Sequence, residues 1–130
     1  MSMSDTEKRI LPHIHFDGET DLIKRMPDTE TVRTVAEAMK QLGDPSRLRI
    51  FWLLCHCEEC VINIAAATEM SSPAVSHHLR LLKNAGLIVS DRRGKEMYYR
   101  ASDAPIAEKL HRTIEEVAMI SCPDMSFDDE

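Results

Sequence analysis

The chain has 130 residues, of which 43% are hydrophobic and 29% are charged, so it can form one domain with a modest core but not two. No apolar run approaches the roughly 20 residues that span a bilayer, and the N-terminus lacks the apolar stretch of a signal peptide. These features exclude a membrane protein and predict a cytoplasmic one, while the net charge of −6 argues at first sight against a nucleic-acid partner.

The N-terminal segment, residues 1–27, shows no sustained hydrophobic period and contains two prolines and a glycine. We therefore expect an N-terminal arm that could include a short helix. From residue 28 the pattern changes to that of an amphipathic helix, with Asp28 or Thr29 as N-cap and Gly43 at the C-terminal stop. Its apolar face consists of Val32, Val35, Ala36, Met39 and Leu42.

The segment DPSRLRIFWLL predicts a second helix, with Asp44 as its N-cap and Pro45 in its first turn. Residues 48–54 are nearly all apolar, so this helix should be central to the core. A short helix over 60–68, a tight turn and another helix over 72–86 come next. This succession fits a helix-turn-helix.

The second helix of this pair has two distinct faces. Val75, Leu79 and Leu82 recur at helical spacing and should point inward. The opposite face carries side chains that could hydrogen-bond to base edges in DNA, although a solvated polar face that binds nothing has the same pattern. The predicted DNA-binding residues here are Ser72, Ser76, His77, Arg80 and Lys83.

A predicted β-hairpin follows, because LIVSD and EMYYR are typical of strands and the basic segment RRGK between them contains Gly94. Residues 71–100 carry six basic against two acidic side chains, which leaves ten basic and twenty acidic ones for the rest of the chain. Such a local basic face on an acidic body can still bind phosphates. We expect this hairpin to act as a wing that contacts phosphates through Arg92, Arg93 and Lys95.

The last predicted helix spans 103–121, with Ser102 as a possible cap. Its His111 and Glu115 form an i, i+4 pair that we interpret as solvated helix surface. Residues 123–130 are acidic and predicted to be disordered. The helix also carries an apolar stripe that should meet a symmetry mate, and this stripe consists of Ile106, Leu110, Ile114 and Val117.

Three of the four cysteines lie within the six residues CHCEEC, as Cys55, Cys57 and Cys60. In a reducing compartment such clusters favour metal or redox chemistry over disulfides, and thiolates suit soft ions such as Zn(II), Cd(II), Pb(II) or Cu(I). Packing as small buried hydrophobes is the plain alternative. We predict that these three cysteines are metal ligands, and the possible additional ligands are His13, His15, His56 and Cys122.

Three segments together resemble the ArsR/SmtB family of metal-sensing winged helix-turn-helix repressors: LGDPSRLRIFWLL, SSPAVSHHLRLLKNAGLIVSDRRGKEMYYR and the helix start at Cys60. The resemblance covers about residues 30–122. It implies a mainly α-helical winged helix-turn-helix domain over 28–122 and a homodimer whose first and last helices form the interface. It also implies a repressor that releases its double-stranded operator when an inducer binds. For this chain we expect a Cd, Pb, Zn or As(III) type of inducer and no organic cofactor.

The resemblance is incomplete at both of the family's metal sites. Cys60 matches a ligand position of the cadmium and lead sensors, but Ile62 stands where those sensors usually carry another cysteine. At the site between the C-terminal helices Asp103 is retained and Pro105 replaces a histidine, so we expect no zinc site there.

Two other functions compete with metal sensing. A repressor of the same fold could respond to oxidants or reactive sulfur through its cysteines, and a zinc-stapled interaction module would not bind DNA at all. An enzyme is not expected, because no set of nucleophile, base and pocket-forming residues stands out and the C-x-C spacing differs from that of thiol oxidoreductases.

Overall fold

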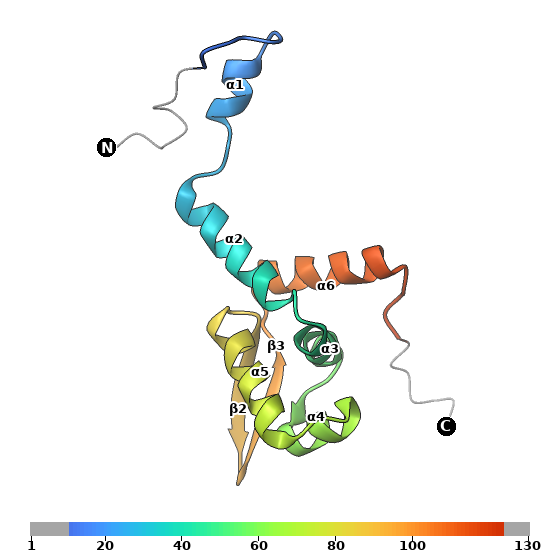
Figure 1. Ribbon diagram of the computed structural model, residues 1–130. Coiled ribbons are helices and arrows are strands. Elements are labelled where there is room, and N and C mark those ends of the chain that lie inside the picture. Colours follow the sequence, from blue (N-terminus) through green and yellow to red (C-terminus); the bar gives the residue numbers. More distant parts are fainter. Residues whose placement is uncertain (1–10, 124–130) are drawn as a thin grey trace. The chain divides into compact units, whose positions relative to one another are not determined.

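The computed structural model describes residues 11–123 of the chain, so residues 1–10 and 124–130 lie outside the described part. The tail predicted to be disordered, residues 123–130, falls almost wholly in the second of these ranges. The chain divides into two compact units, Met1–Glu37 and Ala38–Glu130, each of which is described by itself. In chain order (Figure 1) the elements are α1 (Glu19–Lys24), α2 (Thr29–Gln41), α3 (Pro45–Leu54), β1 (Glu59–Cys60), α4 (Val61–Thr68), α5 (Ser72–Asn84), β2 (Ile88–Arg93), β3 (Glu96–Ala101) and α6 (Pro105–Ala118).

In the first unit the arm contains the short helix α1, which starts after Gly18 in a left-handed conformation with φ of 90°. Glu19 is buried and accepts a hydrogen bond from the backbone nitrogen of His15 at 3.0 Å. Helix α2 starts where the Asp28 carboxylate accepts the backbone N–H of Thr31 at 2.7 Å, and this contact lowers the pKa of Asp28. The N-cap predicted for this helix is therefore Asp28.

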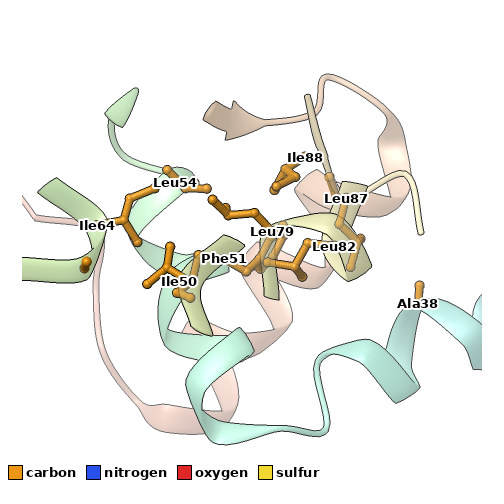
Figure 2. Packing of buried hydrophobic residues seen from close by; sticks show 12 residues of the cluster. Ala38, Ile50, Phe51, Leu54, Ile64, Leu79, Leu82, Leu87 and Ile88 are labelled. Carbon is orange, nitrogen blue, oxygen red and sulfur yellow. The ribbon is translucent and has the colours of Figure 1, made fainter. Parts of the chain in front are cut away.

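In the second unit helix α3 is central to the core, as its apolar sequence predicted. It begins where the Asp44 carboxylate accepts the backbone N–H of Arg47 at 3.0 Å, directly before Pro45, which confirms both start signals. Figure 2 shows that α3, α4, α5 and the start of β2 contribute side chains to one cluster. Its largest fully buried members are Ile50, Phe51, Leu54, Ile64, Val75, Leu79, Leu82, Leu87 and Ile88.

Helices α4 and α5 form the predicted helix-turn-helix. The turn between them passes through Glu69, which is left-handed with φ of 56°, and α5 begins where Ser71 Oγ accepts the backbone N–H of Ala74 at 3.3 Å. The inward positions predicted for Val75, Leu79 and Leu82 are confirmed, because none is more than 1% exposed. Packing of α5 against both α3 and α4 fixes the orientation of its outer face.

The predicted hairpin is also present, with Gly94 at φ of 65° in the turn between β2 and β3. A third, two-residue strand was not predicted: β1 pairs antiparallel with β3, and Cys60 lies opposite Tyr98. The sheet order is therefore β1-β3-β2. This pairing ties the cysteine-containing segment to the wing.

Helix α6 is shorter than predicted. Ser102 Oγ accepts the backbone N–H of Ala104 at 2.9 Å, so it closes a turn before the helix instead of capping it, and α6 starts at Pro105. The helix ends at Ala118, and its C-cap residue Met119 is left-handed with φ of 59°. Of the predicted apolar stripe, Ile106, Leu110 and Ile114 pack against the core of their own chain, whereas Val117 is 80% exposed. Within residues 11–123 no helix has the length and apolar character needed to cross a membrane.

Two isoleucines on helix α4 provide a matched test of this core, because Ile64 is fully buried and Ile62 is 67% exposed. We expect Ile64→Ala to lower the free energy of unfolding by about 2–5 kcal/mol, through lost burial and the cavity it leaves. Ile62→Ala should change it by less than about 0.5 kcal/mol. Chemical denaturation at one fixed protein concentration measures both values. Equal losses in the two variants would contradict the packing described here.

Candidate nucleic-acid interface and metal centre

The outer face of α5 is polar and exposed, as predicted. Ser72, Ser76, His77 and Arg80 are all exposed, and Arg80 Nη2 lies 3.0 Å from His77 Nδ1. The guanidinium and the imidazole therefore stand side by side on one helical face, where both can donate hydrogen bonds to an acceptor outside the chain. Contact of these residues with DNA stays a prediction.

The neighbouring His78 has a different role, since it is half-buried against the start of α3. Its Nδ1 lies 3.3 Å from Arg47 Nη1 and 4.0 Å from the Asp44 carboxylate. Burial lowers the pKa of His78, and the Asp44 carboxylate opposes this change. Because this contact joins α5 to the N-terminus of α3, it holds the candidate recognition helix at a defined angle.

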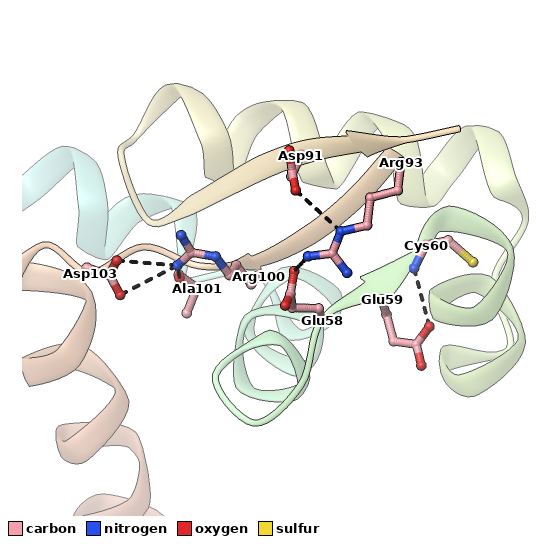
Figure 3. A network of polar contacts seen from close by, with 8 residues as sticks. All are labelled: Glu58, Glu59, Cys60, Asp91, Arg93, Arg100, Ala101 and Asp103. Atoms are coloured by element: carbon pink, nitrogen blue, oxygen red, sulfur yellow. Dashed lines mark hydrogen bonds and ion pairs between the residues drawn. The ribbon is translucent and has the colours of Figure 1, made fainter. Parts of the chain in front are cut away.

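The basic residues at the end of α5 and in the wing are not equally available for DNA contacts. Lys83 Nζ donates to Ser90 Oγ at 2.6 Å, while Arg92 and Lys95 are exposed near the hairpin turn. Arg93, by contrast, contacts the carboxylates of Glu58 at 2.6 Å and Asp91 at 3.3 Å (Figure 3). Two carboxylates thus offset the charge of the side chain that was predicted to contact phosphate.

The cysteines of CHCEEC lie on three consecutive pieces of structure. Cys55 follows α3 as its C-cap, the Cys57 thiol donates to the Leu53 carbonyl at 3.5 Å, and Cys60 is the buried N-cap residue of α4. Burial raises the pKa of Cys55 to about 12, and burial together with the charge of Glu59 raises the pKa of Cys57. Both shifts favour the neutral thiol over the thiolate, which is the form that binds metal.

A different group of potential ligands converges in the described part of the chain. The donor atoms of His56, His111, Glu115 and Cys122 all lie within 4.8 Å of one another, and this is the one group of three or more His, Cys, Asp or Glu in residues 11–123 that could hold a metal ion. His56 comes from the turn after α3, His111 and Glu115 from α6, and Cys122 from the segment beyond α6. Two of the possible additional ligands, His56 and Cys122, are thus brought together, whereas Cys55, Cys57 and Cys60 are not members of the group.

The interpretation of His111 and Glu115 as solvated surface is wrong. Their side chains are only 19% and 11% exposed, and His111 Nε2 lies 3.1 Å from Glu115 Oε2. The reason is that this face of α6 covers the end of α3, where Trp52 Nε1 donates to Glu115 Oε2 at 3.1 Å. The i, i+4 spacing was a correct signal for proximity, but the partner that buries the pair is 63 residues away in sequence.

Glu115 is the acceptor around which the group is organised. The Cys122 thiol donates to Glu115 Oε1 at 2.8 Å, and this hydrogen bond lowers the pKa of Glu115 and raises that of Cys122. Cys122 reaches this position because the left-handed Met119 reverses the chain, and the backbone N–H of Ile120 donates to the Glu115 carbonyl at 3.0 Å.

The histidines of the arm belong to the first unit and have their own surroundings. His13 and His15 are exposed and stacked, with ring centroids 6.0 Å apart. His15 Nδ1 contacts the Glu19 carboxylate at 3.2 Å. This arrangement is that of two exposed surface histidines, and their role as metal ligands stays a prediction.

A helix-turn-helix followed by a β-hairpin, with a polar outer face on the second helix, defines a winged helix-turn-helix DNA-binding protein. Residues 44–90 match the family of bacterial regulatory proteins named arsR family. The chain belongs to the ArsR/SmtB family of transcriptional regulators.

Individual relatives agree with this assignment. A transcriptional repressor SmtB homolog from Synechocystis sp. is 35% identical over 92 residues, which are 71% of this chain and 70% of the relative. A cadmium resistance transcriptional regulatory protein CadC homolog from Staphylococcus aureus is 34% identical over 105 residues, 77% of this chain and 83% of the relative. A solved homodimeric winged helix-turn-helix DNA-binding domain from Mycobacterium bovis, a possible ArsR-family regulator, has a TM-score of 0.63 at 32% identity and covers 72% of this chain and 88% of that one.

The pairing of Arg93 with Glu58 generates a prediction about DNA binding. In Glu58→Gln the Arg93 guanidinium loses one carboxylate partner and becomes more available to phosphate. We expect tighter binding to any duplex. The plot of log binding constant against log salt concentration should also become steeper, by the equivalent of up to about one released counterion. Fluorescence anisotropy with a duplex of arbitrary sequence, measured over a range of salt concentrations, gives both quantities.

The matched control is Glu108→Gln, which breaks an exposed pair with Arg112, 3.2 Å apart, on α6. It removes the same charge from a part of the chain outside the wing and should change the salt slope little. An identical change in both variants would mean that net charge, and not the release of Arg93, is responsible.

Proposed function

We propose that this chain is a homodimeric repressor that binds operator DNA through α5 and the wing and releases it when a thiophilic metal ion binds. The observation that carries the proposal is the exposed polar face of α5 beside a basic hairpin on an otherwise acidic chain. Arg80, Ser76 and His77 would contact bases, while Arg92, Lys95 and, less strongly, Arg93 would contact phosphates.

Exposed apolar side chains support the dimer. Val35 and Met39 of α2 are 39% and 55% exposed, and Val117 of α6, Met119 and Ile120 are all exposed as well. Side chains of this size on two helices favour burial against another surface. The solved M. bovis relative is a homodimer, and a two-fold pair of recognition helices could enter successive major grooves about one helical turn apart.

Two observations support a metal ion as the signal. A relative that is 34% identical is named for cadmium resistance, and this chain places two imidazoles, a carboxylate and a thiol together at one point. Ions of the Cd, Pb, Zn or As(III) type remain the proposed inducers, with no organic cofactor. Cys55, Cys57 and Cys60 remain predicted ligands, but closing them on one ion would require the segment between α3 and α4 to rearrange.

The proposed recognition face can be tested by replacing Arg80. Arg80→Ala should weaken binding to a duplex selected from a random library by about 1–3 kcal/mol, because the guanidinium that can donate two hydrogen bonds to one guanine is lost. Binding to a scrambled duplex should weaken much less. Arg80→Lys keeps the charge but not the planar guanidinium with its paired donors. It should therefore lose most of the preference for the selected duplex over the scrambled one.

The charge-matched control is Arg112→Ala on α6, which should bind both duplexes as the unchanged protein does. If Arg80→Ala retained the full preference for the selected duplex, α5 would not present the proposed recognition face. Analytical ultracentrifugation of the same samples at micromolar concentration reports the dimer, and a monomer with intact operator binding would contradict the proposed assembly.

A further inference from the structure

We propose that His56, His111, Glu115 and Cys122 of one chain form a binding site for a Zn(II)-like divalent ion. This inference rests on the proposed function, because it assigns the signal of the metal-responsive repressor to this group and not to Cys55, Cys57 and Cys60. The ion would join the turn after α3 to the end of α6 within a single protomer.

The donor set is the first reason. Two imidazole nitrogens, one carboxylate oxygen and one thiolate sulfur form a mixed set of the kind that Zn(II) accepts in tetrahedral sites. A set with a single sulfur suits a borderline ion better than an ion that requires only soft ligands. The sequence alone pointed to the three clustered cysteines, and the structure brings together a different combination.

The spacing of the donor atoms is the second reason. His56 Nε2 and His111 Nε2 are 3.1 Å apart, and they lie 3.3 Å and 3.1 Å from Glu115 Oε2. Cys122 Sγ lies 3.7 Å from His111 Nε2. In a tetrahedral zinc site, nitrogen and oxygen ligands are separated by about 3.3 Å, and a nitrogen and a sulfur by about 3.6 Å. These four separations are therefore close to those that one bound ion would impose. The 2.8 Å contact between Cys122 Sγ and Glu115 Oε1 would lengthen, and the widest separation in the group, up to 4.8 Å, would shorten.

Hydrogen bonding cannot satisfy this arrangement completely. An imidazole nitrogen either donates a proton or accepts one, so the three contacts among His56, His111 and Glu115 Oε2 can include at most two ordinary hydrogen bonds. One contact must place two donors or two acceptors against each other. An ion at the centre removes this conflict, because all three atoms then direct a lone pair toward it.

A hydrogen-bond donor lies next to the carboxylate, as is usual for carboxylates that bind a metal ion. Trp52 Nε1 donates to Glu115 Oε2, and the Trp52 ring lies 4.5 Å from the His56 ring between centroids. Such outer contacts orient ligands and raise metal affinity. Trp52 is also the single tryptophan of the chain, so tryptophan fluorescence reports on the surroundings of this side chain.

The position of the site explains how an ion could change DNA binding. His56 is followed by Glu58, which pairs with Arg93 of the wing, and by Cys60, which lies opposite Tyr98 on β3 and caps α4. Fixing the turn at His56 to α6 therefore acts on the segment that connects directly to both the wing and the helix-turn-helix. By linkage, the ion and the operator must weaken each other's binding by the same factor.

The test is a titration of the full-length reduced protein with Co(II), a spectroscopic stand-in for Zn(II), followed by competition with Zn(II). We expect one ion per chain, the intense d–d absorption of a tetrahedral site, a sulfur-to-Co(II) charge-transfer band and quenching of Trp52. Cys122→Ser should remove the charge-transfer band, and His111→Gln should weaken Zn(II) affinity at least about tenfold. Glu115→Gln and Glu116→Gln form a matched pair, because Glu115 is buried in the site and Glu116 beside it is exposed. Only Glu115→Gln should lose affinity for Zn(II).

Operator binding, measured for each variant with and without Zn(II), separates the site from the proposed function. We expect metal-free binding to be retained in Cys122→Ser, whose side chain is exposed, while the Zn(II)-induced loss of affinity falls from at least about fivefold to near none. If Cys57→Ser removed the charge-transfer band and Cys122→Ser kept it, the ion would bind the clustered cysteines and this inference would be wrong. If Zn(II) released the operator equally from the unchanged protein and Cys122→Ser, metal-responsive repression would stand but this site would not be its sensor.

Discussion

The antiparallel pairing of two residues, Glu59 and Cys60, with Tyr99 and Tyr98 is the constraint on which the remaining structure depends. It places the start of α4 against the wing, so the helix-turn-helix and the hairpin share one backbone connection. It also fixes the end of the turn that begins after α3. Because Glu58 directly precedes β1, the pairing also holds the Glu58 carboxylate in reach of the Arg93 guanidinium, 2.6 Å away.

Much of the fold was predictable because its signals are local. Asp44 and Pro45 mark a helix start within four residues, and the period of Val75, Leu79 and Leu82 identifies the buried face of α5 without knowledge of its partners. The hairpin likewise follows from alternating strands around Gly94. Each of these features depends on neighbours in sequence, and the structure confirms each one.

What could not be predicted depends on contacts between distant segments. A strand of two residues has no periodicity to detect, so β1 was missed. The burial of His111 and Glu115 requires Trp52 on another helix, and the position of Cys122 requires a chain reversal at Met119, where no glycine signals it. The clustered cysteines lie within six residues of one another in sequence, whereas the four convergent side chains come from three separate segments.

The exposure of Cys122 has a consequence for how fast an ion could leave. Three of the four convergent side chains, those of His56, His111 and Glu115, are largely buried, but Cys122 lies beyond the end of α6 and is exposed. At the proposed site, a competing thiol in solution would therefore replace Cys122 first, by associative exchange, while the other three side chains still held the ion. The lifetime of the bound ion would then be set by the concentration of small-molecule thiols, so the same site could hold its ion tightly at equilibrium and still exchange it rapidly.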